Sequence, residues 1–247
     1  MAASLTNERN AIATFVISKV ETSGYAWEQW NSKIVELYCI AISRQDLAGN
    51  GHGPMECQTK SPKVFHHVLN PERYIDYGAS QSTGFTNHYT TYCPTFQMIF
   101  KELYHFLAEL PKPVCLVAHN GNAFDFRYIR NECACIHQSL PEDLLCADSK
   151  LGFQKLLKGE PGKKQYGLPA LYKRFVGIDI TPMRAEEKAK MLLQCILHTK
   201  DEFLSWAEEN CKYLLDIRPF ISQEGSNDGI IANDPIGDIL DDLGLRC

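Results

Sequence analysis

The alternation of apolar and polar residues is most informative between positions 114 and 135. An uninterrupted apolar run at 114–118 predicts a short buried strand, and the turn-forming residues His119-Asn120-Gly121 end it. Apolar residues then recur at helical spacing, which predicts a helix with one face toward a core: Phe124, Phe126, Ile129 and Cys133. Asp125 falls in the first turn of this helix, at the carboxyl end of the strand, where open α/β sheets place their sites.

The same analysis predicts a series of further elements. Apolar, β-branched runs predict strands over 11–20, 32–43 and 64–69, with a short one near 144–147. Apolar residues at spacings of three and four predict helices over 95–110, 168–175, 182–196 and 202–215. This order indicates an α/β fold, a mixed sheet flanked by helices on both faces.

The chain divides into one domain and two ends. Residues 1–10 are polar, and we expect them to be disordered. Residues 11–220 have the length and apolar content of one globular domain. The tail at 221–247 begins with a stretch rich in Gly, Asn and Asp. It ends in a short amphipathic helix that starts at Asp234-Pro235 and has Ile236, Ile239, Leu240 and Leu243 on one face.

Charge is concentrated in the tail. The formal net charge is −5, and residues 221–247 contain six acids against one base, which is also −5. Residues 1–220 are therefore formally neutral, and charge alone neither shows nor excludes nucleic-acid binding. The helix at the end of the tail either packs on its own domain or binds a protein partner through residues 233–247.

The cysteines and the hydropathy indicate the compartment. The ten cysteines are scattered among apolar segments, and we interpret them as reduced thiols of an intracellular protein, cytoplasmic or nuclear. Residues 1–9 lack the apolar run of a secretory signal, and no apolar run approaches membrane-spanning length. We therefore expect no membrane association.

Several segments resemble, in the right order, the DEDDh branch of the 3′→5′ exonucleases, which contains the three-prime repair exonucleases. Residues 14–24, TFVISKVETSG, resemble the first motif, a strand that ends in Asp-x-Glu-Thr-Thr-Gly. Residues 79–84 resemble a loop that ends in Thr-Gly, 114–135 the second motif and 181–188 the third. The resemblance covers most of 12–214 and implies an RNase H-like fold.

The family implies a two-metal site at which four carboxylates hold Mg²⁺ or Mn²⁺ and a histidine acts as general base. Glu21 and Asp125 match two of the carboxylates, and they would be the metal ligands if the protein were active. The other positions depart from the pattern. Lys19 replaces the first aspartate, Met183 the histidine and Lys188 the last aspartate.

These departures predict a catalytically degraded site without cofactor. Two lysines in place of two aspartates change the local charge by +4, the charge of the two metal ions that would be lost. Lys19 and Lys188 would neutralise Glu21 and Asp125 directly. An alternative is an active Mg²⁺-dependent exonuclease with a displaced third motif, in which Glu186 or Glu187 is the acid. A further alternative is a protein-interaction module that acts through the acidic C-terminal helix.

The resemblance also implies a place for a single-stranded 3′ end. Thr22, Gly24, His119 and Asn120 match positions near the terminal nucleotide in the family. Aromatic residues at 25–30 are candidates for base stacking or for covering the rim of the sheet. Lysines at 158–164 are candidates for phosphate contacts, although a solvated charged loop is the commoner meaning of such a run.

Overall fold

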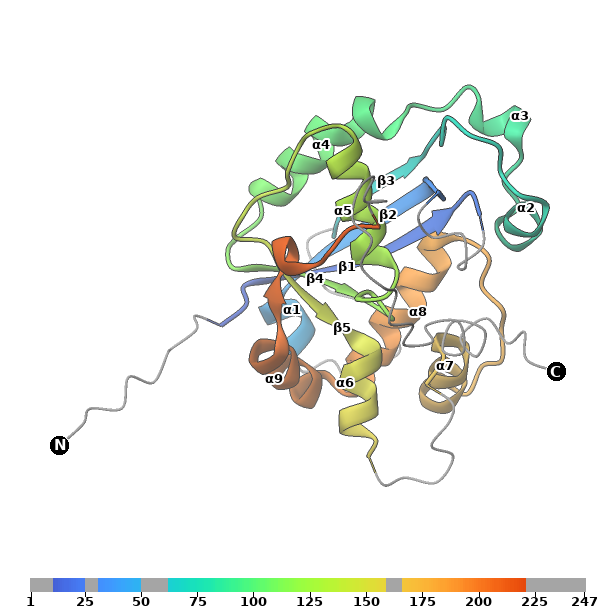
Figure 1. Cartoon of the computed structure of the whole chain (residues 1–247). Helices are drawn as coiled ribbons and strands as arrows, with labels where there is room; N and C mark the ends of the chain where they lie inside the picture. Colours follow the sequence, from blue (N-terminus) through green and yellow to red (C-terminus); the bar gives the residue numbers. More distant parts are fainter. Residues whose placement is uncertain (1–10, 25–30, 50–61, 159–165, 221–247) are drawn as a thin grey trace, which may run out of the picture.

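The computed structural model describes residues 11–24, 31–49, 62–158 and 166–220. Within these residues six strands form one sheet in the order β3-β2-β1-β4-β5-β6 (Figure 1). The pairs β1–β4 and β4–β5 are parallel and the other neighbours are antiparallel, which gives a mixed sheet. The strands are β1 (Thr14–Thr22), β2 (Ile34–Ser43), β3 (Lys63–Val68), β4 (Val114–Ala118), β5 (Leu145–Asp148) and β6 (Lys212–Tyr213).

Helices cover both faces of this sheet (Figure 1). One apolar core lies between the sheet and the helices α4 (Phe96–Ala108) and α5 (Asp125–Cys135). A second core lies on the other face, where the sheet packs against α6 (Ser149–Leu156), α7 (Leu168–Val176), α8 (Ala185–His198) and α9 (Lys200–Asn210). The predicted fold class, an RNase H-like mixed sheet flanked by helices on both faces, is confirmed.

The central strand β1 contributes side chains to both apolar cores. Side chains alternate along a strand, so Val16 and Val20 enter one core while Phe15 and Ile17 enter the other. All four are buried, because β1 lies in the interior of the sheet. Lys19 and Glu21 follow on the face of Phe15 and Ile17, where the strand runs on past its parallel neighbour β4.

The structure corrects two parts of the predicted element map. The helix expected over 202–215 ends at Asn210, because the chain then forms β6, which pairs with the edge of β5, and the 3₁₀ turn η2 (Leu214–Asp216). Short helices were not predicted at α1 (Arg44–Ala48), α2 (Tyr77–Thr83) and α3 (Asn87–Thr90). None of these has enough turns to show a helical apolar period.

The predictions for residues 1–10, 25–30, 159–165 and 221–247 lie outside the described residues. These include the disordered N-terminus, the loop aromatics, two of the three lysines and the amphipathic tail helix. No helix in the described ranges is long and apolar enough to cross a membrane.

Candidate active site

Lys19 and Asp125 form an ion pair at the carboxyl end of β1. Lys19 Nζ lies 2.9 Å from Oδ1 and 3.0 Å from Oδ2 of Asp125, so the ammonium group contacts both carboxylate oxygens. Oδ1 also accepts a hydrogen bond from the backbone N–H of Val20, at 2.9 Å. Asp125 is fully buried, and Lys19 Nζ lies 4.9 Å from the centre of the Phe124 ring. The carboxylate thus joins the start of α5 to the end of β1.

Lys188 and Glu21 form a second pair of the same kind. Lys188, from α8, places Nζ 2.7 Å from Oε1 and 2.8 Å from Oε2 of Glu21. Burial raises the pKa of the Glu21 carboxyl above its ordinary value, and the charges of Lys188 and Lys19 oppose this effect. The side chains of Lys188 and Glu21 are 19% and 9% exposed, so the pair is largely shielded from water.

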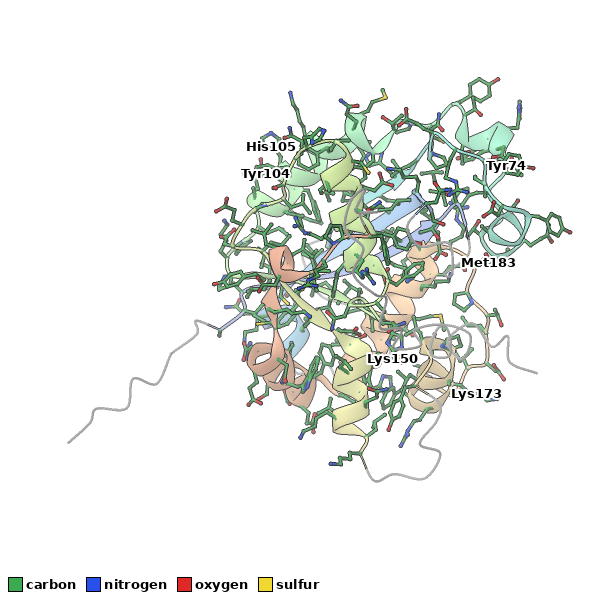
Figure 2. All side chains as sticks on the ribbon, viewed as in Figure 1. Tyr74, Tyr104, His105, Lys150, Lys173 and Met183 are labelled. Carbon is green, nitrogen blue, oxygen red and sulfur yellow. The ribbon has the colours of Figure 1, made fainter. Side chains whose placement is uncertain are left out.

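The third-motif residues occupy distinct places around this pair. Met183 is 43% exposed in the segment before α8, and its Cε lies beside Gly84 (Figure 2). The carboxylate of Glu187 accepts the backbone N–H groups of Met183 and Arg184 at the start of α8. Glu186 pairs with Lys190. Lys188 is therefore the residue of this helix turn that the fold brings to Glu21.

A second carboxylate network, which sequence reasoning missed, anchors α8 to the sheet. Glu36 on β2 is completely buried and stands opposite Glu21 in the β1–β2 register. It accepts hydrogen bonds from Arg184 Nη2 at 3.0 Å, from the Ala185 backbone N–H at 2.8 Å and from His66 Nε2 at 2.9 Å. Burial alone would raise the pKa of Glu36, but these donors outweigh it and lower the pKa.

A signal for this network is present in the sequence. Glu36 is an acid between Val35 and Leu37 in an otherwise apolar strand, and such a residue needs a buried partner. The partner, Arg184, lies 148 positions away along the chain. Nothing in the spacing of the two residues points from one to the other.

The imidazole of His119 is held between two internal partners. Burial lowers the pKa of His119 to about 3, so the ring is neutral. Nε2 lies 2.8 Å from the carbonyl oxygen of Tyr166 and therefore carries the proton. Nδ1, 3.0 Å from Ser149 Oγ, then accepts the hydroxyl proton. Both ring nitrogens are engaged within the protein.

The other residues suggested for a nucleotide lie at the ends of β1 and β4. Thr22 is buried, and its hydroxyl donates to the Gly24 carbonyl oxygen at 3.1 Å. Asn120 adopts φ 59°, a left-handed conformation that asparagine tolerates. Its carbonyl oxygen accepts the N–H groups of Ala123 and Phe124 and so shapes the turn into α5.

The site does not fit the pair of divalent metal ions that the sequence resemblance implies. Mg²⁺ and Mn²⁺ need carboxylate oxygens. Both oxygens of Asp125 and both oxygens of Glu21 are already within 3.0 Å of an ammonium nitrogen. Across the described residues, no group of three His, Cys, Asp or Glu side chains is arranged to hold a metal ion.

Comparison with known proteins finds relatives that share most of the chain. Three prime repair exonuclease 2 of Mus musculus and of Homo sapiens are both 27% identical over 219 residues, which cover 83% of this chain and 92% of each relative. Three-prime repair exonuclease 1 of Bos taurus is 26% identical over 223 residues, 84% of this chain and 70% of the relative. No protein-family model matches the sequence.

Solved structures share the fold at low sequence identity. A 3′-exonuclease described in the 3′-end specific recognition of histone mRNA stem-loop superposes with a TM-score of 0.61 at 14% identity, covering 78% of this chain and 83% of that one. The nuclease domain of a DEDDh family member bound to rAMP gives 0.60 at 13% identity, over 78% and 94%. The chain therefore resembles three prime repair exonucleases in sequence and DEDDh 3′-exonucleases in fold.

Proposed function

We propose that this relative of the three prime repair exonucleases is a catalytically degraded exonuclease that binds the 3′ ends of single-stranded nucleic acid without cutting them. The observation that carries the proposal is the pair of contacts Lys19–Asp125 and Lys188–Glu21. An ammonium group lies against each of the two carboxylates and balances its charge. It also occupies the oxygens that a catalytic metal would need.

The general base is also replaced. The resemblance puts Met183 where the family has its histidine, and a thioether takes up no proton at neutral pH. The neutral ring of His119 is no substitute, because both of its nitrogens are bound to Ser149 and Tyr166. On this proposal, neither a pair of metal ions nor a general base activates a water molecule at the part of the site that the structure describes.

Two observations support nucleic acid as the ligand. The relatives are named for three prime repair, and the solved neighbours are described with a histone mRNA stem-loop and with rAMP. In this chain, Thr22 and Gly24 follow Lys19 and Glu21 at the end of β1, and Asn120 lies in the turn that leads from β4 to Asp125. A terminal nucleotide there would meet backbone groups and two ion pairs, a neutral surface in place of a metal centre.

The test is a nuclease assay on 3′-labelled single-stranded DNA and RNA, with Mg²⁺ and with Mn²⁺, paired with a binding assay on the same oligonucleotides. The wild type is expected to bind and not to degrade. A Lys19→Asp, Met183→His, Lys188→Asp variant restores the family residues and is expected to gain metal-dependent degradation. Its control adds Asp125→Ala, which removes a metal ligand and should abolish the gain.

Other outcomes separate the alternatives. Degradation by the wild type that is lost in a Glu21→Ala, Asp125→Ala variant would show an active exonuclease and refute the proposal. Absence of both degradation and binding would also refute it, and would direct attention to residues 233–247 and a protein partner.

A further inference from the structure

Four tyrosines between residues 74 and 92 stand out from the surface. Tyr74 is 72% exposed, Tyr77 78%, Tyr89 55% and Tyr92 80%. They belong to α2, α3 and the segments that flank these helices, which lie together on one side of the molecule (Figure 1). Tyr74 is labelled in this region in Figure 2. Because a tyrosine presents on the order of 200 Å² of surface, these four exposed rings, called the tyrosine patch below, together present several hundred Å² of aromatic surface.

Two of the four rings are held in place by neighbours. The Tyr89 ring stacks on Phe85, with 6.1 Å between centroids and 22° between planes. The Tyr92 ring meets His88 edge to face at 5.6 Å. Rings that are already ordered lose little conformational freedom when a ligand stacks on their open side. The Tyr89 and Tyr92 rings are therefore already in position for a flat ligand, such as a nucleobase, to stack on them.

The patch is attached to the candidate active site. The N–H of Asp76 donates to the carbonyl oxygen of Ser23, two residues after Glu21, at 2.8 Å. Phe85, beneath Tyr89, supports the Arg184 guanidinium 3.9 Å above its ring, and Arg184 directly precedes α8, the helix that carries Lys188. Asp76 and Phe85 of this segment therefore contact the end of β1 and the residue before α8, the two elements that carry Lys19, Glu21 and Lys188.

The composition of the segment specifies how it would bind. Residues 74–92 contain no lysine or arginine and a single acid, Asp76. Attraction to phosphate would therefore contribute little to ligand binding at this segment, and contact with the aromatic rings would contribute most of it. Stacking of bases on aromatic rings is tolerant of sequence, because every base has a flat π face.

We propose that Tyr74, Tyr77, Tyr89 and Tyr92 form a stacking platform for the unpaired bases that lie upstream of a 3′ end held at the Lys19–Asp125 and Lys188–Glu21 site. This inference rests on the proposed function and extends it from the terminal nucleotide to the strand behind it. The platform accounts for single-strand preference, since paired bases have no free faces. It also predicts a weak salt dependence, because few phosphates are neutralised along it.

The test compares 5′-fluorescein oligonucleotides of about 4 and about 12 nucleotides by anisotropy, a range that matches common single-strand site sizes. The wild type should bind the longer one at least about tenfold more tightly, equivalent to stacking of one base or more. A Tyr74→Ala, Tyr77→Ala, Tyr92→Ala variant should lose this gain and retain the affinity for the short one. These three rings are the most exposed of the four, so the fold should tolerate their loss.

A matched control is Tyr213→Ala, which removes a 53% exposed tyrosine from β6, at the opposite edge of the sheet from β3. It should leave both affinities unchanged. If the triple variant retains the gain with length, the platform is refuted while end binding stands. If neither oligonucleotide binds the wild type, the proposed function fails and the platform fails with it.

Discussion

Lys188 and Glu21 form the pair on which the proposed loss of metal binding depends. With a metal at the site, Glu21 would be a ligand, and with Lys188 it becomes half of a shielded ion pair. Removing one partner of such a pair leaves an uncompensated buried charge, which typically costs about 3–5 kcal/mol. Removing both partners of the pair costs much less stability, because no unpaired charge is left buried. A neutral residue in place of Lys188 should therefore lower stability unless Glu21 is made neutral as well or a metal ion supplies the lost positive charge.

We predict that Lys188→Met lowers the free energy of unfolding by about 3 kcal/mol and that Glu21→Gln added to it recovers much of the loss. Urea denaturation of both single variants and the double variant measures the coupling. Lys190→Met is the control on the same helix. Lys190 pairs with Glu186 in the open, with 55% and 42% exposure, and its loss should cost under about 1 kcal/mol. Equal costs at positions 188 and 190 would contradict a shielded pair.

His119 provides a prediction about pH. Its pKa is about 3 in the folded protein and near 6.5 when unfolded, so between these values only the unfolded state binds the proton. The contribution of His119 to stability is thus complete above pH 6.5 and is lost as the pH falls toward 3. His119→Gln retains a donor for Tyr166 and an acceptor for Ser149, and has no proton to gain.

Between pH 7 and pH 5, the wild type should lose about 2 kcal/mol more unfolding free energy than His119→Gln. Urea titrations at both pH values measure the difference. Parallel losses in the two proteins would mean that the imidazole is protonated in the fold.

Single residues were predicted from the sequence to unequal degrees. Glu21, Asp125, Lys19 and Lys188 were proposed as site residues because each lies within a segment that resembles a family motif, and the structure pairs them. Glu36 was missed, because its role depends on Arg184 and His66, which come from other parts of the chain. Local pattern shows that a residue is unusual, and the fold shows what it is paired with.

At the scale of elements, the turn between β4 and α5 sets the position of Asp125. A Cβ on Gly121 would stand 2.5 Å from Phe126 Cε2 and 2.9 Å from the Ala118 Cβ. The glycine thus allows the helix to start close against the end of its strand. Only then does the first residue of α5 reach the Val20 N–H and Lys19 on β1.

We predict that Gly121→Ala destabilises the protein by about 1–3 kcal/mol, the usual cost of overpacking. Thermal unfolding monitored by circular dichroism measures this cost. Gly177→Ala is the comparison, because Gly177 has φ +81° but open space around it, so its cost is backbone strain of about 1–2 kcal/mol. Oligonucleotide binding should weaken in Gly121→Ala and not in Gly177→Ala. Weaker oligonucleotide binding by Gly177→Ala than by Gly121→Ala would contradict a role of the turn in positioning Asp125.

The elements themselves were largely predictable, and the exceptions have a common physical cause. Long periodic segments such as α4 and the apolar run of β4 were identified in place. The end of α9 was missed because β6 is stabilised by pairing with β5, a contact that is absent from its own sequence. The helices α2 and α3, which carry the tyrosine patch, are too short for periodicity to show.

At the scale of the whole molecule, the fold brings three distant segments to one place. Lys19 and Asp125 are 106 positions apart, and Glu21 and Lys188 are 167 positions apart. The parallel strands β1 and β4 end at the same side of the sheet. The start of α8 is fixed to β2 by the hydrogen bond from the Ala185 N–H to Glu36. The fold thus brings both ion pairs to the end of β1.

The most direct measurement of the central claim is a Mn²⁺ titration followed by the electron paramagnetic resonance of the free ion. The account predicts no site-specific binding by the wild type. It predicts metal binding by a Lys19→Asp, Lys188→Asp variant, which regains four carboxylates. Two Mn²⁺ ions bound by the wild type and lost in Glu21→Ala, Asp125→Ala would show that the lysines leave the site open to metal, and would contradict the account.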